Sequence, residues 1–192
     1  MTTNTTTNPK ASTVSTMNAT TLTANPANPT AAPSTGAGTG HTETGRIDFA
    51  KSAPKVFRAL VGFDAAAREG LDPALVELIK IRASHVNHCA YCLYLHTNDA
   101  RKAGESEDRL HLVAVWREAR HFFSEREQAA LALTDAVTLI ADGGLPDDVY
   151  AQAAAQFDEQ ELAHVLALIL TINTWNRVAL STGKLAGTDQ RG

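Results

Sequence analysis

Four residues between positions 77 and 96 have types and a spacing that suit thiol redox chemistry. Glu77 is followed after eleven residues by Cys89, which forms a Cys-x-x-Cys pair with Cys92, and His96 comes four positions later. A thiol attacks a peroxide only as the thiolate, and a free cysteine with a pKa of about 8.5 is mostly protonated at neutral pH. Within a helix, the i, i+4 step from Cys92 to His96 would bring an imidazole beside the second sulfur. The pattern therefore predicts a dithiol site with its own base.

Glu77 is expected to orient and polarise His96, which completes a set of nucleophile, base and orienting group. In one continuous helix, the step from Glu77 to Cys89 would span about 18 Å, too far for a shared site. The chain must therefore turn between them, and His-Val-Asn-His at 85–88 is the only polar stretch of poor helix propensity available. Cys89 would then begin a new helix, where unpaired backbone N–H groups stabilise a thiolate.

The elements that must position these residues all have helical periodicity. From Ile47 onward no stretch alternates as a strand does, so we expect an all-α fold, a compact helical bundle. The last helix is apolar nearly all the way round, which predicts central burial or an oligomer interface. Caps, prolines and glycines predict seven helices: about 54–68, a second from Pro73 with Asp72 as N-cap, about 89–104, 107–119, a fifth from the Ser124–Glu127 capping box through 141, 146–157, and 158–182 closed by Gly183.

Composition divides the chain into a tail and one domain. With 192 residues, of which 44% are hydrophobic, there is material for one ordinary globular domain. Residues 1–45 are rich in Thr, Asn, Ala, Pro and Gly and have almost no large apolar side chain to bury, so we expect a disordered tail. The helical domain is expected at 46–183, and 184–192 would form a short C-terminal tail.

Charge and hydropathy exclude several classes of partner. The formal net charge of -4 leaves no basic footprint, so we expect neither nucleic acid nor an anionic membrane as a partner. The longest apolar run, Val165 to Ile172, is too short to span a bilayer. The N-terminus has no basic and apolar regions of a secretory signal, so a cytoplasmic location is expected. In that compartment a Cys-x-x-Cys pair indicates redox or metal chemistry rather than a structural disulfide.

Zinc binding is the nearest chemical alternative, because five potential ligands are close in sequence. They lie in a single short segment, whereas structural zinc sites usually have separated ligand pairs on two elements, so we expect no bound metal. We instead expect His88 and Tyr91 to lie near the pocket in which the dithiol site meets its substrate. The five potential ligands are His85, His88, Cys89, Cys92 and His96.

The sequence resembles the AhpD-like alkylhydroperoxidases of the carboxymuconolactone decarboxylase superfamily. Their signature is Glu-x11-Cys-x-x-Cys-x3-His, and Glu77, Cys89, Cys92 and His96 match it position by position. The segments 123–127, 132–134 and 172–177 also look like those of single-domain members, and the resemblance covers about 47–182.

The resemblance implies an α-helical fold, homo-oligomers, and peroxidase turnover in which the cysteine pair cycles between dithiol and disulfide. It implies no haem, flavin or metal cofactor. One position departs from the family pattern, because well-studied members often carry His where this chain has Tyr91. A phenol with a pKa of about 10 cannot act as a base at neutral pH, so we expect no proton relay through this position.

The expected reaction is the reduction of an alkyl hydroperoxide or hydrogen peroxide through sulfenic acid and disulfide states. A dithiol donor, of thioredoxin or lipoyl type, would restore the pair by exchange. Which cysteine meets the peroxide stays open: Cys92 has His96 one turn away, whereas Cys89 is expected to be more exposed and better placed for exchange. The alternatives are a decarboxylase-like enzyme of the same superfamily, and a redox-responsive oligomeric sensor.

Overall fold

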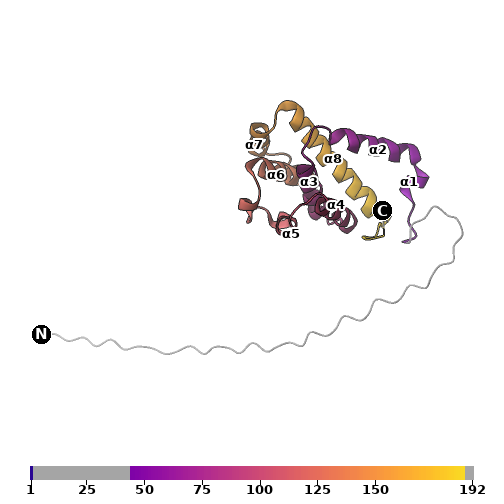
Figure 1. Ribbon diagram of the computed structural model, residues 1–192, viewed down its shortest axis with the longest axis horizontal. Coiled ribbons are helices and arrows are strands. Elements are labelled where there is room, and N and C mark those ends of the chain that lie inside the picture. Colours follow the sequence, from indigo (N-terminus) through magenta and orange to yellow (C-terminus); the bar gives the residue numbers. More distant parts are fainter. Residues whose placement is uncertain (2–43, 189–192) are drawn as a thin grey trace. The chain divides into compact units, whose positions relative to one another are not determined.

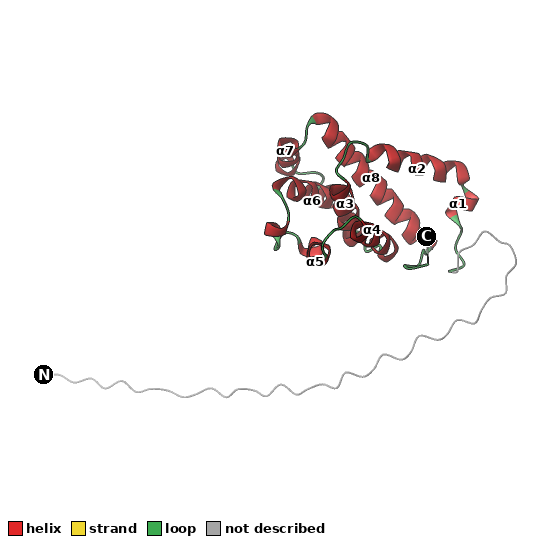
Figure 2. Cartoon of the chain, in the orientation of Figure 1, coloured by secondary structure: helices red, strands yellow, loops and turns green. Residues whose placement is uncertain are grey.

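The computed structural model of the chain describes Met1 and residues 44–188. The expected tail at 1–45 lies almost entirely outside these residues, as does the end of the expected C-terminal tail. Within 44–188 the regular structure is helical and contains no strand (Figures 1 and 2). The predicted all-α fold is confirmed. None of the helices in this part is long and apolar enough to cross a membrane.

Eight α-helices and three short 3-10 helices follow one another along the described part of the chain. They are α1 (Phe49–Ser52), α2 (Pro54–Ala67), α3 (Pro73–Val86), α4 (Ala90–Lys102), α5 (Glu107–Leu112), η1 (Val113–Val115), η2 (Arg120–Phe122), α6 (Glu125–Thr138), η3 (Ile140–Asp142), α7 (Asp147–Gln156) and α8 (Glu159–Thr182).

Helix α3 lies at the centre of the bundle and packs against α4, α6 and α8 (Figure 1). Its start is fixed by the Asp72 carboxylate, which accepts hydrogen bonds from the backbone N–H groups of Ala74 and Leu75, and by Pro73 at the first helical position. Apolar side chains leave α3 in several directions, because it is covered on several sides. The α3 residues that face α4 and α2 therefore lie in the interior of the bundle.

Helix α8 is the second central element, as its apolar composition predicts. A capping box of Asp158 and Glu161 begins it, and Gly183 ends it in the left-handed conformation with a φ of 66°. Val165, Leu168 and other apolar side chains of α8 are fully buried against α2, α3 and α6. Central burial is thus the outcome within one protomer.

Two apolar clusters hold the bundle together, one on each side of α3. The first joins α3, α6, α7 and α8 around Ile79, Leu133 and Phe157. The second joins α3, α4, α5 and α6 around Leu78 and the buried Trp116. Because apolar packing holds α3 on both sides, the helix pair α3–α4 has a fixed position in the bundle.

The expectation of one helix over 107–119 is wrong. Helix α5 ends at Leu112 and continues as a 3-10 helix and a turn. The backbone carbonyl of Ala114 accepts a hydrogen bond from Arg82 at 2.6 Å, and the Trp116 indole donates to Asp135 at 3.2 Å. These tertiary contacts draw the segment away from the α-helical path, which local propensity alone could not indicate.

Two smaller differences also concern helix ends. The fifth expected helix stops at Thr138, and residues 140–142 form a 3-10 turn before the positive-φ Gly143. The short helix α1 was not predicted; it is capped by Asp48, whose carboxylate accepts from the Lys51 N–H at 3.2 Å. Helix α1 matters for function because Asp48 and Phe49 line a cavity described below.

Candidate active site

The chain turns between α3 and α4 where the sequence predicts. Helix α3 ends at Val86, and the exposed His88 adopts a positive φ of 55°, a conformation that is uncommon outside glycine and asparagine. The Asn87 side chain ties the turn to α8 by donating to the Oδ1 atoms of Asn173 and Asn176, at 3.0 and 2.9 Å. The turn reverses the chain and brings α4 back along α3.

The two cysteines lie at the start of α4. Cys89 is its N-cap residue and accepts a hydrogen bond at Sγ from the backbone N–H of Cys92, at 3.4 Å. The two Sγ atoms are 2.6 Å apart, and both residues are free thiols. A disulfide bond is about 2.05 Å long, so the thiols can be joined with little movement of the backbone.

Both cysteines are buried, with exposed fractions of 1% for Cys89 and 3% for Cys92. The expectation that Cys89 is the more exposed is therefore wrong. The reason is its packing: the two cysteines form a small buried cluster with Ala179 of α8, and Tyr91 packs against this cluster.

The surroundings shift the pKa values of the two thiols in opposite directions. The hydrogen bond with the Cys92 thiol lowers the pKa of Cys89 to about 7, against the effect of burial, and backbone N–H groups and the Asn176 side chain lower it further. The same sulfur–sulfur hydrogen bond, together with burial, raises the pKa of Cys92. At neutral pH Cys89 is therefore about half thiolate, and this thiolate accepts a hydrogen bond from the Cys92 thiol.

Glu77 and His96 come together across the α3–α4 pair. His96 Nδ1 lies 2.9 Å from Glu77 Oε2, and both side chains are largely buried. Because a carboxylate only accepts hydrogen bonds, this contact keeps the hydrogen on Nδ1 and leaves Nε2 with a free lone pair. The geometry gives His96 the tautomer that a base needs.

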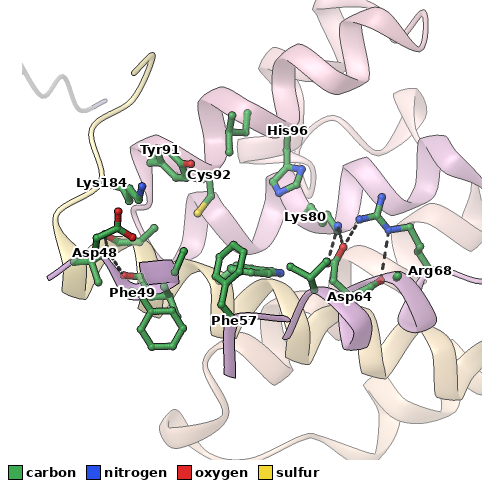
Figure 3. Close-up of a pocket in the computed structure, with 18 residues that line it drawn as sticks. Asp48, Phe49, Phe57, Asp64, Arg68, Lys80, Tyr91, Cys92, His96 and Lys184 are labelled. Carbon is green, nitrogen blue, oxygen red and sulfur yellow. Dashed lines mark hydrogen bonds and ion pairs between the residues drawn. The ribbon is translucent and has the colours of Figure 1, made fainter. Parts of the chain in front are cut away.

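A cavity of about 560 Å³ lies between α1, α2, α3, α4 and α8 (Figure 3). Cys92, His96 and Tyr91 line it, whereas Cys89, Glu77 and the exposed His88 do not. Most of the wall is apolar. The apolar and aromatic lining residues are Phe49, Ala50, Phe57, Val61, Ala65, Leu95, Trp175, Val178 and Ala179.

A buried ion pair forms part of the same wall, and sequence reasoning missed it. Lys80 Nζ donates to the Asp64 carboxylate at 2.9 and 3.1 Å, and Asp64 is also paired with Arg68 and accepts from Thr171. Burial acts to raise the pKa of Asp64, but Lys80 and Arg68 together bring it below its ordinary value. The position of Lys80 between Ile79 and Ile81 was the signal in the sequence that could have indicated a buried, paired charge.

Asn176 is the second functional candidate that sequence reasoning missed. It is completely buried; Nδ2 donates to Ser84 Oγ at 3.1 Å, and Oδ1 accepts from Asn87 at 2.9 Å. Its side chain also hydrogen-bonds the thiol pair and favours the thiolate of Cys89. The segment 172–177 resembles that of family members, but nothing in its spacing indicates contact with a cysteine.

One group of side chains in the described part of the chain has the composition of a metal site. Potential ligand atoms of Glu77, His96 and Asp99 lie within 4.8 Å of one another. The group contains neither cysteine, and His96 Nδ1 is engaged by Glu77. Among the described residues, the zinc site considered for the cysteine segment is therefore not assembled.

Comparisons with known proteins define the class to which this fold and site belong. The sequence pattern of the Carboxymuconolactone decarboxylase family matches residues 54–136. The uncharacterized protein YdfG of Bacillus subtilis is 34% identical over 144 residues, which make up 74% of this chain and 97% of YdfG. The chain therefore belongs to the carboxymuconolactone decarboxylase family.

Solved structures place it among the AhpD-like folds of that family. A protein of unknown function from Agrobacterium tumefaciens, described as a putative antioxidant defence protein AhpD, is 37% identical; the match has a TM-score of 0.72 and covers 75% of this chain and 99% of that one. An AhpD-core, peroxidase-related protein from Ralstonia eutropha shares the fold at 20% identity, with a TM-score of 0.63 over 72% of this chain and 74% of that one. Members of this class are in general enzymes of peroxidase-related or decarboxylase-like function.

Proposed function

We propose that the protein is a thiol-dependent peroxidase that reduces hydroperoxides through Cys89 and Cys92. The observation that carries this proposal is the sulfur pair at 2.6 Å, of which Cys92 lies in the wall of a cavity that His96 also lines. The description of the Agrobacterium tumefaciens relative as a putative antioxidant defence protein is consistent with it.

Cys92 is the residue that meets the peroxide, because its sulfur borders the cavity and that of Cys89 does not. In molecules in which Cys89 carries its own proton, Cys92 first gives its proton to His96, whose Nδ1 is held by Glu77 and whose Nε2 can accept it, because a neighbouring Cys89 thiolate opposes the ionisation of Cys92. The Cys92 thiolate then attacks one peroxide oxygen, and the O–O bond breaks. Cys92 becomes a sulfenic acid, and the other oxygen leaves as an alkoxide that takes the proton to form ROH.

Cys89 resolves the sulfenic acid. Its pKa of about 7 makes it about half thiolate at neutral pH, and its sulfur is already next to that of Cys92. Attack on the sulfenic sulfur forms the disulfide and releases water after proton uptake. A small dithiol donor of lipoyl or thioredoxin type then restores both thiols.

The test measures peroxide consumption by the purified protein. With dihydrolipoamide or dithiothreitol as donor, the wild type should consume cumene hydroperoxide or hydrogen peroxide over many turnovers. The number of free thiols should fall by two per chain when peroxide is added without donor. Cys89→Ser and Cys92→Ser should both lose turnover, while Thr97→Ser, a conservative change elsewhere on α4, should keep it.

Each other outcome points to a different function. Thiol loss without turnover by any dithiol would favour a redox-responsive sensor over an enzyme. No reaction of the thiols with peroxide at all would refute the peroxidase proposal. Decarboxylation of a lactone acid that persists in the double serine variant would establish the other chemistry found in the family.

A further inference from the structure

The buried pair of Lys80 and Asp64 lies in the cavity wall, where stability does not account for it. Lys80 is 2% exposed and Asp64 is 6% exposed. Removing two charges from water costs several kcal/mol per ion, and apolar side chains of similar size are often as stable or more stable in such positions. Both residues border the cavity that contains Cys92 and His96. A charged wall at this point is therefore a candidate for a chemical role.

Helix geometry places Lys80 close to the proposed base. Lys80 follows Glu77 by three residues on α3, so the two side chains leave neighbouring positions on the helix surface. Glu77 in turn holds His96. Figure 3 shows His96, Lys80 and Asp64 at the same end of the cavity, with the sulfur of Cys92 between this end and the end that holds Asp48 and Lys184.

The cluster around Lys80 has a surplus of positive charge. Asp64 carries one negative charge, and Lys80 and Arg68 each carry one positive charge. Thr171 also donates to the Asp64 carboxylate, at 3.3 Å, so the side chains of Lys80, Arg68 and Thr171 together fix its position. Asp64 thereby holds the Lys80 ammonium in the cavity wall, where the positive charge of Lys80 can act on a negative charge inside the cavity.

We propose that the Lys80 ammonium stabilises the negative charge that develops on the leaving oxygen of the peroxide. This inference rests on the proposed peroxidase function. When the Cys92 thiolate forms its S–O bond, the O–O bond breaks and its electron pair goes to the leaving oxygen, which becomes RO⁻. The proton that His96 received from Cys92 converts RO⁻ to ROH, and Lys80 keeps its own proton throughout.

Such a role makes the effect of Lys80 depend on the leaving group. An alkoxide is a strongly basic leaving group, so breaking the O–O bond of an alkyl hydroperoxide benefits greatly from a nearby cation. A peracid releases a carboxylate, which is stable in water without such help. Loss of a purely structural lysine would instead slow both reactions equally, because it would disturb the thiol and the base common to both.

The experiment compares single-turnover oxidation of the reduced protein by cumene hydroperoxide and by peracetic acid. The variants are Lys80→Met, Lys80→Arg, and Lys80→Met combined with Asp64→Asn, which leaves no unpaired Asp64 charge. Lys102→Met, on the exposed end of α4, is the matched control. Circular dichroism and thermal melting establish which variants are folded.

For a folded variant without Lys80, the rate with cumene hydroperoxide should fall roughly 100-fold, the size expected for losing one preorganised charge-stabilising group. The rate with peracetic acid should fall far less, Lys80→Arg should recover much of the loss, and Lys102→Met should behave as wild type. Equal losses with both oxidants, or no loss with either, would overturn the role of Lys80 while leaving the peroxidase proposal intact. A wild type that reacts with neither oxidant would instead remove the peroxidase proposal itself.

Discussion

Nδ1 of His96 lies 2.9 Å from Oε2 of Glu77, although 19 positions separate the two residues in the chain. The contact exists because α3 ends at Val86 and α4 returns along it. It fixes the imidazole ring, so that His96 can accept a proton at Nε2 while the Glu77 carboxylate stabilises the resulting imidazolium. Under the proposed function the two residues act as one unit, so the effect of changing either should appear in the pH dependence of the thiol reaction.

His96→Ala should shift the pH profile of peroxide reaction to higher pH, because thiol deprotonation loses its base. Glu77→Gln should shift it in the same direction by less, since an amide oxygen still accepts from Nδ1 but carries no charge. The measurement is the single-turnover rate with hydrogen peroxide from about pH 5 to about pH 9, a span that brackets the ordinary pKa of histidine. His111→Ala, at an exposed histidine of α5, is the control. Superimposable profiles for His96→Ala and wild type would mean that His96 is not the base.

Much of the site could be predicted because its signals are local. The spacing of Glu77, Cys89, Cys92 and His96 predicted that these residues share one region of the fold, and distance along a helix required a turn at 85–88. Capping boxes at Ser124 and Asp158 start helices as predicted, since each depends on residues only three positions apart. Local patterns of this kind do not require knowledge of which helices meet.

The parts that could not be predicted depend on contacts between helices. Asp64 belongs to α2 and Lys80 to α3, and no pattern in the sequence pairs them. Asn176 reaches the thiols because α8 crosses the start of α4, and Cys89 is buried for the same reason. Packing of α8 over the N-cap therefore reversed the expected exposure of the cysteines.

Asn176→Ala should raise the pKa of the thiolate-forming sulfur. In the wild type, hydrogen bonds that include the Asn176 side chain favour the charged form and bring the pKa of Cys89 to about 7. A hydrogen bond to a charged group contributes about 1.5–3 kcal/mol, so its loss should raise the pKa by roughly one to two units. The thiolate fraction at neutral pH would then fall, and resolution of the sulfenic acid would slow.

The ultraviolet absorbance of the thiolate, followed against pH in the reduced protein, measures this shift. Thr174→Ala is the matched control, because Thr174 lies on the same helix but is exposed and donates to the carbonyl of Leu170. An unchanged midpoint in a folded Asn176→Ala protein would show that Asn176 holds α8 in place without affecting the sulfur.

The protein should form a homo-oligomer. Exposed apolar side chains remain on α2 and α8, two helices that pack together: Val56, Phe63, Leu170 and Leu180 are each more than two-fifths exposed. Scattered apolar residues are common on surfaces, but several on adjacent helices favour an interface. Light scattering at micromolar concentration should give a multiple of 20.5 kDa. Leu170→Glu should reduce the mass, whereas Glu118→Gln, a change at an exposed residue outside α2 and α8, should not. A monomeric wild type would contradict the prediction.

The two serine variants should differ in which one can still react once with peroxide. In Cys89→Ser, Cys92 keeps its place beside the cavity and His96, so one equivalent of peroxide should convert it to a sulfenic acid that a dimedone-type probe captures. This variant also lacks the Cys89 thiolate, whose hydrogen bond is the main reason that the pKa of Cys92 is raised, so Cys92 should ionise more readily than in the wild type. In Cys92→Ser, the remaining sulfur does not border the cavity and should be labelled slowly if at all. Mass spectrometry of the labelled peptides shows whether Cys92 or Cys89 is the residue that reacts with peroxide. Rapid labelling of Cys92→Ser and none of Cys89→Ser would exchange the two roles, and the thiolate of Cys89, despite its burial, would then be the attacking group.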